Sequence, residues 1–265
     1  MAKIQSHELR WIHTHHLFYY PESGRTGIEP WQEALNQAMI KGAQACDLCI
    51  CVNRWEQEVL KKEYKTDSVY VPNGVDRRLC DSANGNRFIN KFGVPSDFVL
   101  WVGRHDPVKN PGDFVQLAKL SPTLKFVMIG GLTRETIESF YNLTPPPNLI
   151  LLPHLSRLDV LNAIAACRVL VVTSFREGLP TLVLEAMTLQ KQIVIPNEAG
   201  CLDATNGDEC ARVYEHGNLD QLANQVRDAY EDRHPRSNAR NRIMKEFDWE
   251  IIASRLDRIY QGKTD

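Results

Sequence analysis

The sequence predicts an α/β protein built on parallel β-sheets, with one complete doubly wound domain preceded by a partial one. Short β-rich runs alternate with helical periodicity along the chain, and several runs are continuously apolar, as in strands buried on both faces. Residues 85–245 alone supply six strand–helix units, which is enough for a complete domain. The expected strands are 9–14, 47–52, 68–71, 98–102, 124–129, 149–152, 169–173, 192–195 and 211–214. Helical patterns between them include 31–45, 57–64, 111–120, 157–166, 181–188 and 219–230.

A turn at residues 72–74, with the sequence Pro-Asn-Gly, separates the first three strands from the other six. We therefore expect a partial N-terminal domain over 1–76, a complete domain over 77–246 and a C-terminal segment over 247–265. In that last segment, Trp249 is expected to pack the final helix back toward the first domain. Three parallel strands leave a sheet edge exposed. We expect one of two explanations: the chain is a shortened product, or its first domain is covered by a partner chain or by a second copy of the chain.

Composition and charge exclude several classes of protein. Of the 265 residues, 43% are hydrophobic and 24% are charged, which is the balance of a folded globular protein rather than a disordered one. The net charge of -2 provides no basic surface for a nucleic-acid backbone, and no apolar run is long enough to span a bilayer. The N-terminus lacks the apolar core of a signal peptide, and the seven cysteines are an odd number. A cytoplasmic protein with reduced thiols is the expectation.

Glycine spacing argues against a dinucleotide-binding site. No two of the 15 glycines are spaced two residues apart, so no Gly-x-Gly fingerprint exists. The sequence Gly-Lys-Thr at 262–264 resembles the end of a P-loop, but Asp257 stands where the first glycine of that motif belongs. The ligand site must therefore come from other loops at the carboxyl ends of the strands, where open α/β sheets bind ligands.

Two basic side chains follow the strand expected at 98–102. Gly103 opens this loop, Arg104 follows directly, and Lys109 precedes the next helix. Arg and Lys on one strand-to-helix loop can clamp a diphosphate, because both side chains donate charged hydrogen bonds to phosphate oxygens. The loop therefore predicts a site for an anionic ligand.

The loop after the strand expected at 169–173 adds amide donors and two carboxylates. Glu177 and Gly178 precede a helix start, Glu185 falls about one turn into the helix, and backbone amides around the start are expected to face the ligand. Glu185 has the position to accept hydrogen bonds from ribose hydroxyls, and Glu177 from hydroxyls of a sugar beyond the phosphates. A nucleotide-sugar site is the prediction. The residues expected to form the helix start and its amide donors are Leu179, Pro180 (at the first helical position), Thr181, Leu182 and Val183.

Four stretches, taken in order, resemble the retaining GT-B glycosyltransferases of family 4, the glycogen-synthase-like and mannosyltransferase-like group. They resemble, in turn, the inter-domain "(I/V)PNGVD" motif, the "VGR-x4-K" motif, the "Glu-x7-Glu" motif and the closing "F-(S/D)-W" motif of that family. The resemblance covers most of residues 10–262. It implies two Rossmann-like domains, of which the first is shortened here. The four matching stretches are 71–76, 102–110, 175–187 and 247–260.

The resemblance also implies roles for individual residues. Arg104 and Lys109 would neutralise the donor diphosphate as it leaves, Glu177 would bind the donor sugar, and Glu185 the ribose. His16, which ends a "T-x-H"-like stretch, would face the donor sugar, with His13 and His15 as alternatives.

For the reaction, the resemblance implies that the acceptor attacks the donor sugar on the same face from which the phosphate leaves, and that no side chain of the protein acts as a nucleophile. The donor would be a UDP- or GDP-type sugar bound to the 77–246 domain, and the acceptor an unidentified sugar, lipid or small molecule. The reaction would use no metal and no cofactor, and the sequence contains no Asp-x-Asp metal motif.

Other interpretations remain open beside this one. The chain could be a non-catalytic subunit that binds a nucleotide sugar, a related epimerase or phosphorylase, or a glycoside hydrolase with two carboxylates. The hydrolase interpretation leaves Arg104 and Lys109 unexplained. Glu185, in an apolar stretch, could instead pair with Arg176 or another internal base. The cysteines at 46, 49 and 51 fit core packing better than zinc binding, and the histidines at 13, 15 and 16 are not expected to form a zinc site.

Overall fold

The structure is a computed structural model that describes residues 10–21, 27–234, 236 and 238–263. The chain divides into two compact units, Met1–Asn73 and Gly74–Asp265. The division lies three residues before the end of the predicted N-terminal domain, and it leaves the C-terminal segment within unit 2. Each unit is described by itself.

Unit 1 contains a three-stranded parallel sheet in the order β1-β2-β3. Ile12 pairs with Leu48, and Ile50 with Val69, so the strands run in chain order across the sheet. The three predicted strands are confirmed, although residue 9, where the first was expected to begin, lies outside the described residues. The elements are β1 (Ile12–His15), α1 (Pro30–Ala45), β2 (Leu48–Cys51), α2 (Arg54–Tyr64) and β3 (Val69–Tyr70).

Cysteine side chains belong to the core of unit 1. Cys49 and Cys51 alternate with Ile50 along β2 and pack with Phe18 and Leu60. Burial raises the pKa of both thiols to about 12, which keeps them protonated. All seven cysteines of the chain are free thiols, as the sequence predicts.

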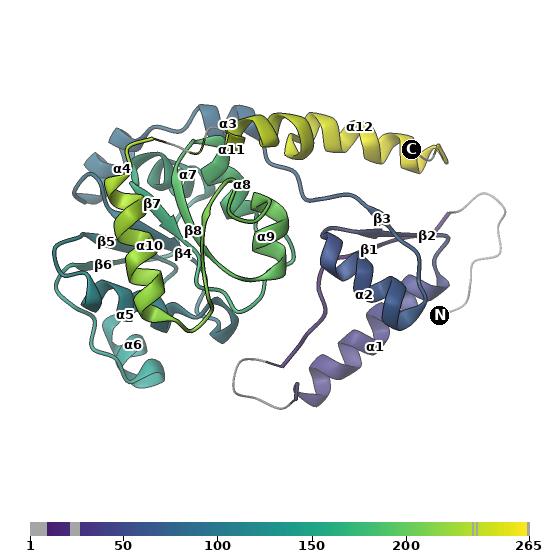
Figure 1. Cartoon of the computed structure of the whole chain (residues 1–265), viewed down its shortest axis with the longest axis horizontal. Helices are drawn as coiled ribbons and strands as arrows, with labels where there is room; N and C mark the ends of the chain where they lie inside the picture. Colours follow the sequence, from purple (N-terminus) through teal and green to yellow (C-terminus); the bar gives the residue numbers. More distant parts are fainter. Residues whose placement is uncertain (1–9, 22–26, 235, 237, 264–265) are drawn as a thin grey trace. The chain divides into compact units, whose positions relative to one another are not determined.

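Unit 2 contains the complete doubly wound domain, with six parallel strands in the order β6-β5-β4-β7-β8-β9. Its strands are β4 (Val99–Val102), β5 (Phe126–Ile129), β6 (Leu149–Leu152), β7 (Val169–Val171), β8 (Gln192–Pro196) and β9 (Arg212–Tyr214). Its longer helices are α5 (Pro111–Leu120), α6 (Arg134–Tyr141), α7 (Arg157–Ala166), α8 (Thr181–Thr188), α10 (Leu219–Glu231) and α12 (Trp249–Tyr260). The helices cover both faces of the sheet: α5 packs against α10 on one face, and α7 against α8 on the other (Figure 1). The predicted α/β fold class is confirmed.

The direction of winding reverses between two adjacent strands. The chain passes from β4 outward to β5 and β6, and α7 then returns it to β7 on the other side of β4. Doubly wound sheets bind ligands at such a switch point, at the carboxyl ends of the strands. The loops that follow β4 and β7 are the two loops that the sequence analysis singled out.

Two short helices follow the Pro-Asn-Gly turn. Asp76 accepts a hydrogen bond from the Leu79 amide and starts α3 (Arg77–Asp81). Asn84 accepts two amide hydrogen bonds and starts α4 (Gly85–Phe92), which packs against α7. Side-chain caps thus turn a polar segment into two helices.

The C-terminal segment is fixed to the start of unit 2. α11 (Asn238–Arg242) continues into a π-helical turn, Ile243–Phe247, after which Asp248 caps α12. Val75 forms a parallel β-bridge with Asp248, and the Trp249 ring lies against Gly74. A side chain at position 74 would overlap that ring, which explains why a glycine belongs in this turn.

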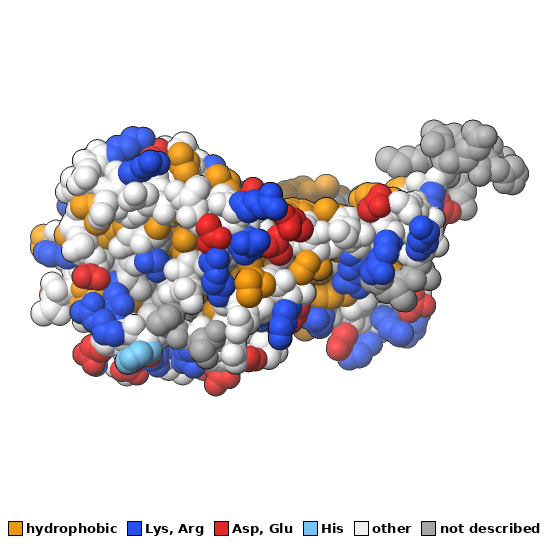
Figure 2. Space-filling model, turned by 90° about the horizontal axis from the view of Figure 1, so that it is seen from above, with side chains coloured by type: hydrophobic (Ala, Val, Ile, Leu, Met, Phe, Trp, Pro, Cys, Tyr) orange, Lys and Arg blue, Asp and Glu red, His pale blue; other side chains and the backbone are white. Residues whose placement is uncertain are grey.

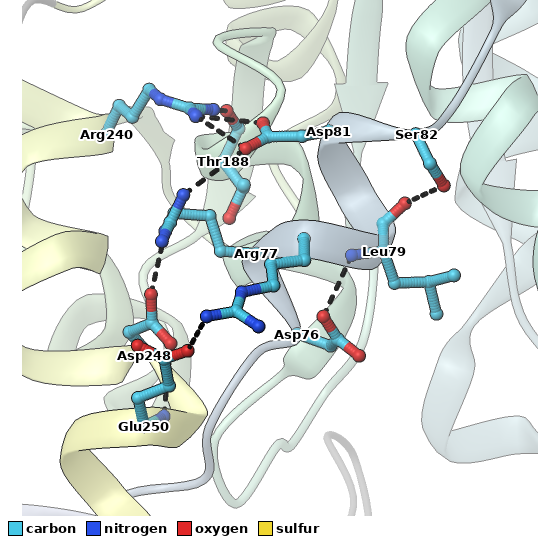
Figure 3. Close-up of polar contacts among 10 residues, drawn as sticks. Asp76, Arg77, Leu79, Asp81, Ser82, Thr188, Arg240, Asp248 and Glu250 are labelled. Carbon is cyan, nitrogen blue, oxygen red and sulfur yellow. Dashed lines mark hydrogen bonds and ion pairs between the residues drawn. The ribbon is translucent and has the colours of Figure 1, made fainter.

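Ion pairs extend this attachment (Figure 3). Arg77 Nε donates to Asp248 Oδ2 at 2.8 Å, and Arg240 pairs with Asp81 at 2.8 Å. Arg240 also donates to the carbonyl of Thr188 at 2.6 Å, at the end of α8. The helix that carries Glu185 is therefore connected to both the beginning and the end of unit 2.

The surface carries charges of both signs. Figure 2 shows Lys and Arg side chains intermixed with Asp and Glu side chains over the described residues of the face it presents. This distribution agrees with the net charge of -2.

Candidate functional site

The loops after β4 and β7 are joined by hydrogen bonds. The Phe175 amide donates to the carbonyl of Val108 at 2.8 Å, and the Thr173 hydroxyl donates to the carbonyl of Lys109 at 2.8 Å. The Trp101 indole donates in turn to the Thr173 hydroxyl. The basic loop and the Glu177 loop therefore meet at one edge of the sheet, at the switch point.

Lys109 and Glu177 are in direct contact. Lys109 Nζ lies 2.6 Å from Glu177 Oε1, with the side chains 27% and 14% exposed respectively. Lys109 ends a 3-10 turn, Pro107–Lys109, whose start is capped by Asp106. A cation and a carboxylate are thus held together at the edge of the sheet where ligands are expected to bind. Both are partly shielded from water, so their interaction is stronger than on an open surface.

Arg104 is more exposed than Lys109. Its side chain is 73% exposed and pairs with Asp106 Oδ2 at 2.9 Å. Asp106 also accepts the Val108 amide, so a single carboxylate orders the turn and holds the guanidinium beside it. Gly103, at the start of the loop, donates to the carbonyl of Ile129 in the neighbouring strand.

The start of α8 differs in two details from the sequence prediction. Pro180 occupies the N-cap rather than the first helical position, and the helix begins at Thr181. The amide of Val183 donates to the Pro180 carbonyl at 3.0 Å, so Val183 does not supply the open amide that was expected. Among the described residues, the amides of Thr181 and Leu182 donate to no protein acceptor. These two remain the donors that α8 offers to an anion, and Gly178 and the buried Leu179 form the preceding turn.

Glu185 is buried and ion-paired. Its carboxylate contacts Arg157, the first residue of α7, whereas Arg176 was the residue named in the sequence analysis. Burial raises the pKa of Glu185, and Arg157 acts in the opposite direction. The sequence analysis missed Arg157, because its only sequence signal is a basic residue at a helix start.

The three candidate histidines of unit 1 occupy different environments. His15 is buried, and its Nε2 lies 3.0 Å from Glu56 Oε2. His16 is exposed, and His13 is half-buried beside Gly42. Of the three, His16 therefore presents the most accessible ring, and its role toward a donor remains a prediction.

Glu198 and Gly200 lie beside the Glu177 loop and were missed by the sequence analysis. Glu198 is the N-cap of α9 (Ala199–Thr205), and its carboxylate accepts the amides of Gly200 and Cys201 at 3.0 and 3.1 Å. Burial raises the pKa of this carboxyl to about 7. Glu is not among the usual N-cap residues Ser, Thr, Asp and Asn, so the sequence carries little signal for this cap.

The described part of the chain lacks two further features. In that part, no group of three or more His, Cys, Asp or Glu side chains has an arrangement that could hold a metal ion. None of the helices described is both long enough and apolar enough to cross a membrane.

Comparisons with known proteins agree with this geometry. The profile of the family "Glycosyl transferases group 1" matches residues 83–246. The chain is 27% identical over 272 residues to the Escherichia coli "UDP-Gal:alpha-D-GlcNAc-diphosphoundecaprenol alpha-1,3-galactosyltransferase", which covers 94% of this chain and 67% of that protein.

Solved structures share the fold at lower identity. Sucrose-phosphate synthase from Thermosynechococcus elongatus superposes with a TM-score of 0.81 and 20% identity, over 96% of this chain and 67% of that one. Anabaena HepE in complex with UDP-glucose superposes with a TM-score of 0.77 and 18% identity, over 95% of this chain and 72% of that one. The family profile matches more than half of the chain, and the site lies within the matched region. The chain therefore belongs to the glycosyl transferases group 1 family and is a glycosyltransferase of the GT-B type that acts on a nucleotide sugar.

Proposed function

We propose that the chain transfers a hexose from a UDP-sugar to a hydroxyl group with retention of configuration and without a metal ion. The observation that carries this proposal is the contact between Lys109 and Glu177 at the switch point, beside the amides of Thr181 and Leu182. A cation and amide donors suit a diphosphate, and a carboxylate at the same place suits the hydroxyls of the attached sugar.

The reaction would proceed on one face of the sugar. The acceptor oxygen forms a bond to the anomeric carbon while the bond from that carbon to the diphosphate oxygen breaks, and the acceptor proton passes to the departing phosphate. Lys109 and Arg104 would stabilise the charge that develops on the diphosphate, which is the main catalytic task when no protein nucleophile takes part. An α-linked product from an α-linked donor requires retention, and the name of the E. coli relative gives an α-1,3 product.

Relatives support a narrower choice of substrates. The E. coli relative is named for UDP-galactose and for an acceptor sugar linked to a lipid diphosphate, and HepE was solved with UDP-glucose. We assign this chain a UDP-hexose donor and, as acceptor, a sugar carried on a lipid diphosphate. Glu185, held by Arg157, is assigned to the ribose, and His16 to the donor sugar.

Donor binding and turnover test this assignment. We expect UDP and UDP-galactose to bind saturably, and the chain to transfer the sugar to a lipid-diphosphate-linked acceptor with an α product by NMR. Addition of EDTA should leave the rate unchanged. Loss of activity with EDTA, restored by a divalent cation, would overturn the metal-independent assignment. Binding without transfer to any acceptor would favour the non-catalytic subunit, and tighter binding of GDP than UDP would overturn the donor assignment.

Glu177→Gln should separate recognition of the sugar from recognition of the diphosphate. The variant loses the carboxylate that accepts sugar hydroxyls and also relieves Lys109 of its ion pair. We expect UDP-sugar binding to weaken by about tenfold to a hundredfold while UDP binds as tightly as before or tighter, since a charge-assisted hydrogen bond contributes about 1.5–3 kcal/mol. Calorimetric titration with both ligands measures this, with Glu138→Gln on the exposed face of α6 as the control. Equal losses for the two ligands would remove the sugar role from Glu177.

A further inference from the structure

The start of α9 packs directly against the turn that carries Glu177. At Gly200, the second residue of α9, a Cβ atom would overlap the carbonyl oxygens of both Glu177 and Gly178. Backbone atoms cannot withdraw from such an overlap as a flexible side chain can. The glycine therefore sets how closely α9 approaches the turn, and with it the position of that turn.

The Glu198 carboxylate lies at the same junction. The Glu198 residue is 9% exposed, and its Oε2 accepts two amides of α9. One of these amides belongs to Gly200, the residue that packs against the Glu177 turn. One buried carboxylate thus holds the residue of α9 that lies against the backbone of the residue assigned to the donor sugar.

The charged residues next to Glu198 act on its carboxylate in opposite directions. Glu177 repels its negative charge, and Arg176 attracts it more weakly. The Glu177 side chain is already paired with Lys109. The carboxylate therefore caps α9 at the cost of its own desolvation.

We propose that Glu198, together with Gly200, is a positioning residue for donor-sugar recognition, because it fixes the backbone of Glu177 and Gly178. Glu198 acts on the turn through Gly200, whose amide it accepts and which lies against the turn, and Glu177 reaches the sugar. This inference rests on the proposed function, because it requires that the Glu177 turn binds the donor sugar. The diphosphate contacts of Arg104, Lys109 and the α8 amides come from other elements and do not depend on Glu198.

Glu198→Ala and Glu198→Gln test the inference. In Glu198→Ala the turn loses its anchor, and we expect kcat/KM for the UDP-sugar to fall by about tenfold to a hundredfold, as for other small displacements of reacting groups. Binding of UDP alone should stay within about twofold of the wild type. Glu198→Gln keeps the acceptor oxygen and should restore most of the loss. Asn84→Ala is the matched control, because it removes a cap that also accepts two amides, at the start of α4.

Hydrogen exchange gives a readout that does not require turnover. We expect the amides of residues 177–179 to exchange faster in Glu198→Ala and in Gly200→Ala than in the wild type, and to be unchanged in Asn84→Ala. If the wild type binds no nucleotide sugar, the proposed function fails, whereas faster exchange at 177–179 would still support the anchoring by Glu198. Unchanged exchange together with unchanged kcat/KM in Glu198→Ala would overturn the inference. Equal weakening of UDP and UDP-sugar would do the same.

Discussion

Replacing Lys109 by methionine is expected to lower kcat/KM for the nucleotide sugar by about a hundredfold to a thousandfold, the usual loss for one group that stabilises developing charge. Methionine keeps much of the length of the side chain but carries no charge. The effect should be large because Lys109 is only 27% exposed and therefore acts through a medium that screens charge less than water does. Steady-state kinetics with varied donor measures the change.

Arg104→Met should have a smaller effect, about tenfold, because this side chain is 73% exposed and already paired with Asp106. Lys119→Met, at the exposed end of α5, is the control and should match the wild type. In Lys109→Met the carboxylate of Glu177 loses its partner and would repel the diphosphate. The double variant with Glu177→Gln should therefore recover part of the lost UDP binding, and a double-mutant cycle measures the coupling. A Lys109→Met enzyme with wild-type kinetics would remove the diphosphate role from this loop.

The fold and the meeting of the two loops were predictable because both follow from local patterns combined with the rules of parallel sheets. Apolar runs such as 169–173 identify buried strands, and the carboxyl ends of parallel strands all lie at one edge. Lys109 and Glu177 follow adjacent strands, so their proximity could be predicted without any knowledge of side-chain packing.

The remaining parts of the site depend on contacts between distant segments, and the sequence carries little signal for them. Arg157 meets Glu185 only because α7 and α8 pack on the same face of the sheet. The start of α9, which Glu198 caps, reaches the Glu177 turn only because Gly200 permits a close approach. At the start of α8, the pattern around Pro180 predicted a helix, but the pairing of the Val183 amide with the Pro180 carbonyl is a detail of backbone geometry.

The Glu198 carboxyl should make the stability of unit 2 depend on pH. Burial raises its pKa from 4.5 to about 7, with a contribution from Glu177 that is opposed by backbone amides and Arg176. Between these pH values the folded chain keeps a proton that the unfolded chain has released. The stability contributed by this group therefore falls as the pH rises from 4.5 to 7, and above pH 7 the folded chain carries the full cost of a buried charge.

Glu198→Gln removes that cost and keeps the acceptor oxygen for Gly200 and Cys201. We expect the variant to exceed the wild type in the free energy of unfolding by about 3 kcal/mol at pH 8, and the difference to shrink toward zero near pH 4.5. Urea unfolding followed across this range measures the difference. Glu209 provides a control of opposite sign, because hydrogen bonds from Asn206 and Asn238 lower its pKa, so Glu209→Gln should lose stability relative to the wild type as the pH rises. If the difference in free energy of unfolding between Glu198→Gln and the wild type stayed constant from pH 4.5 to 8, Glu198 would not carry a proton in the folded chain over that range. The cost of an ionised carboxylate beside the Glu177 turn would then be absent.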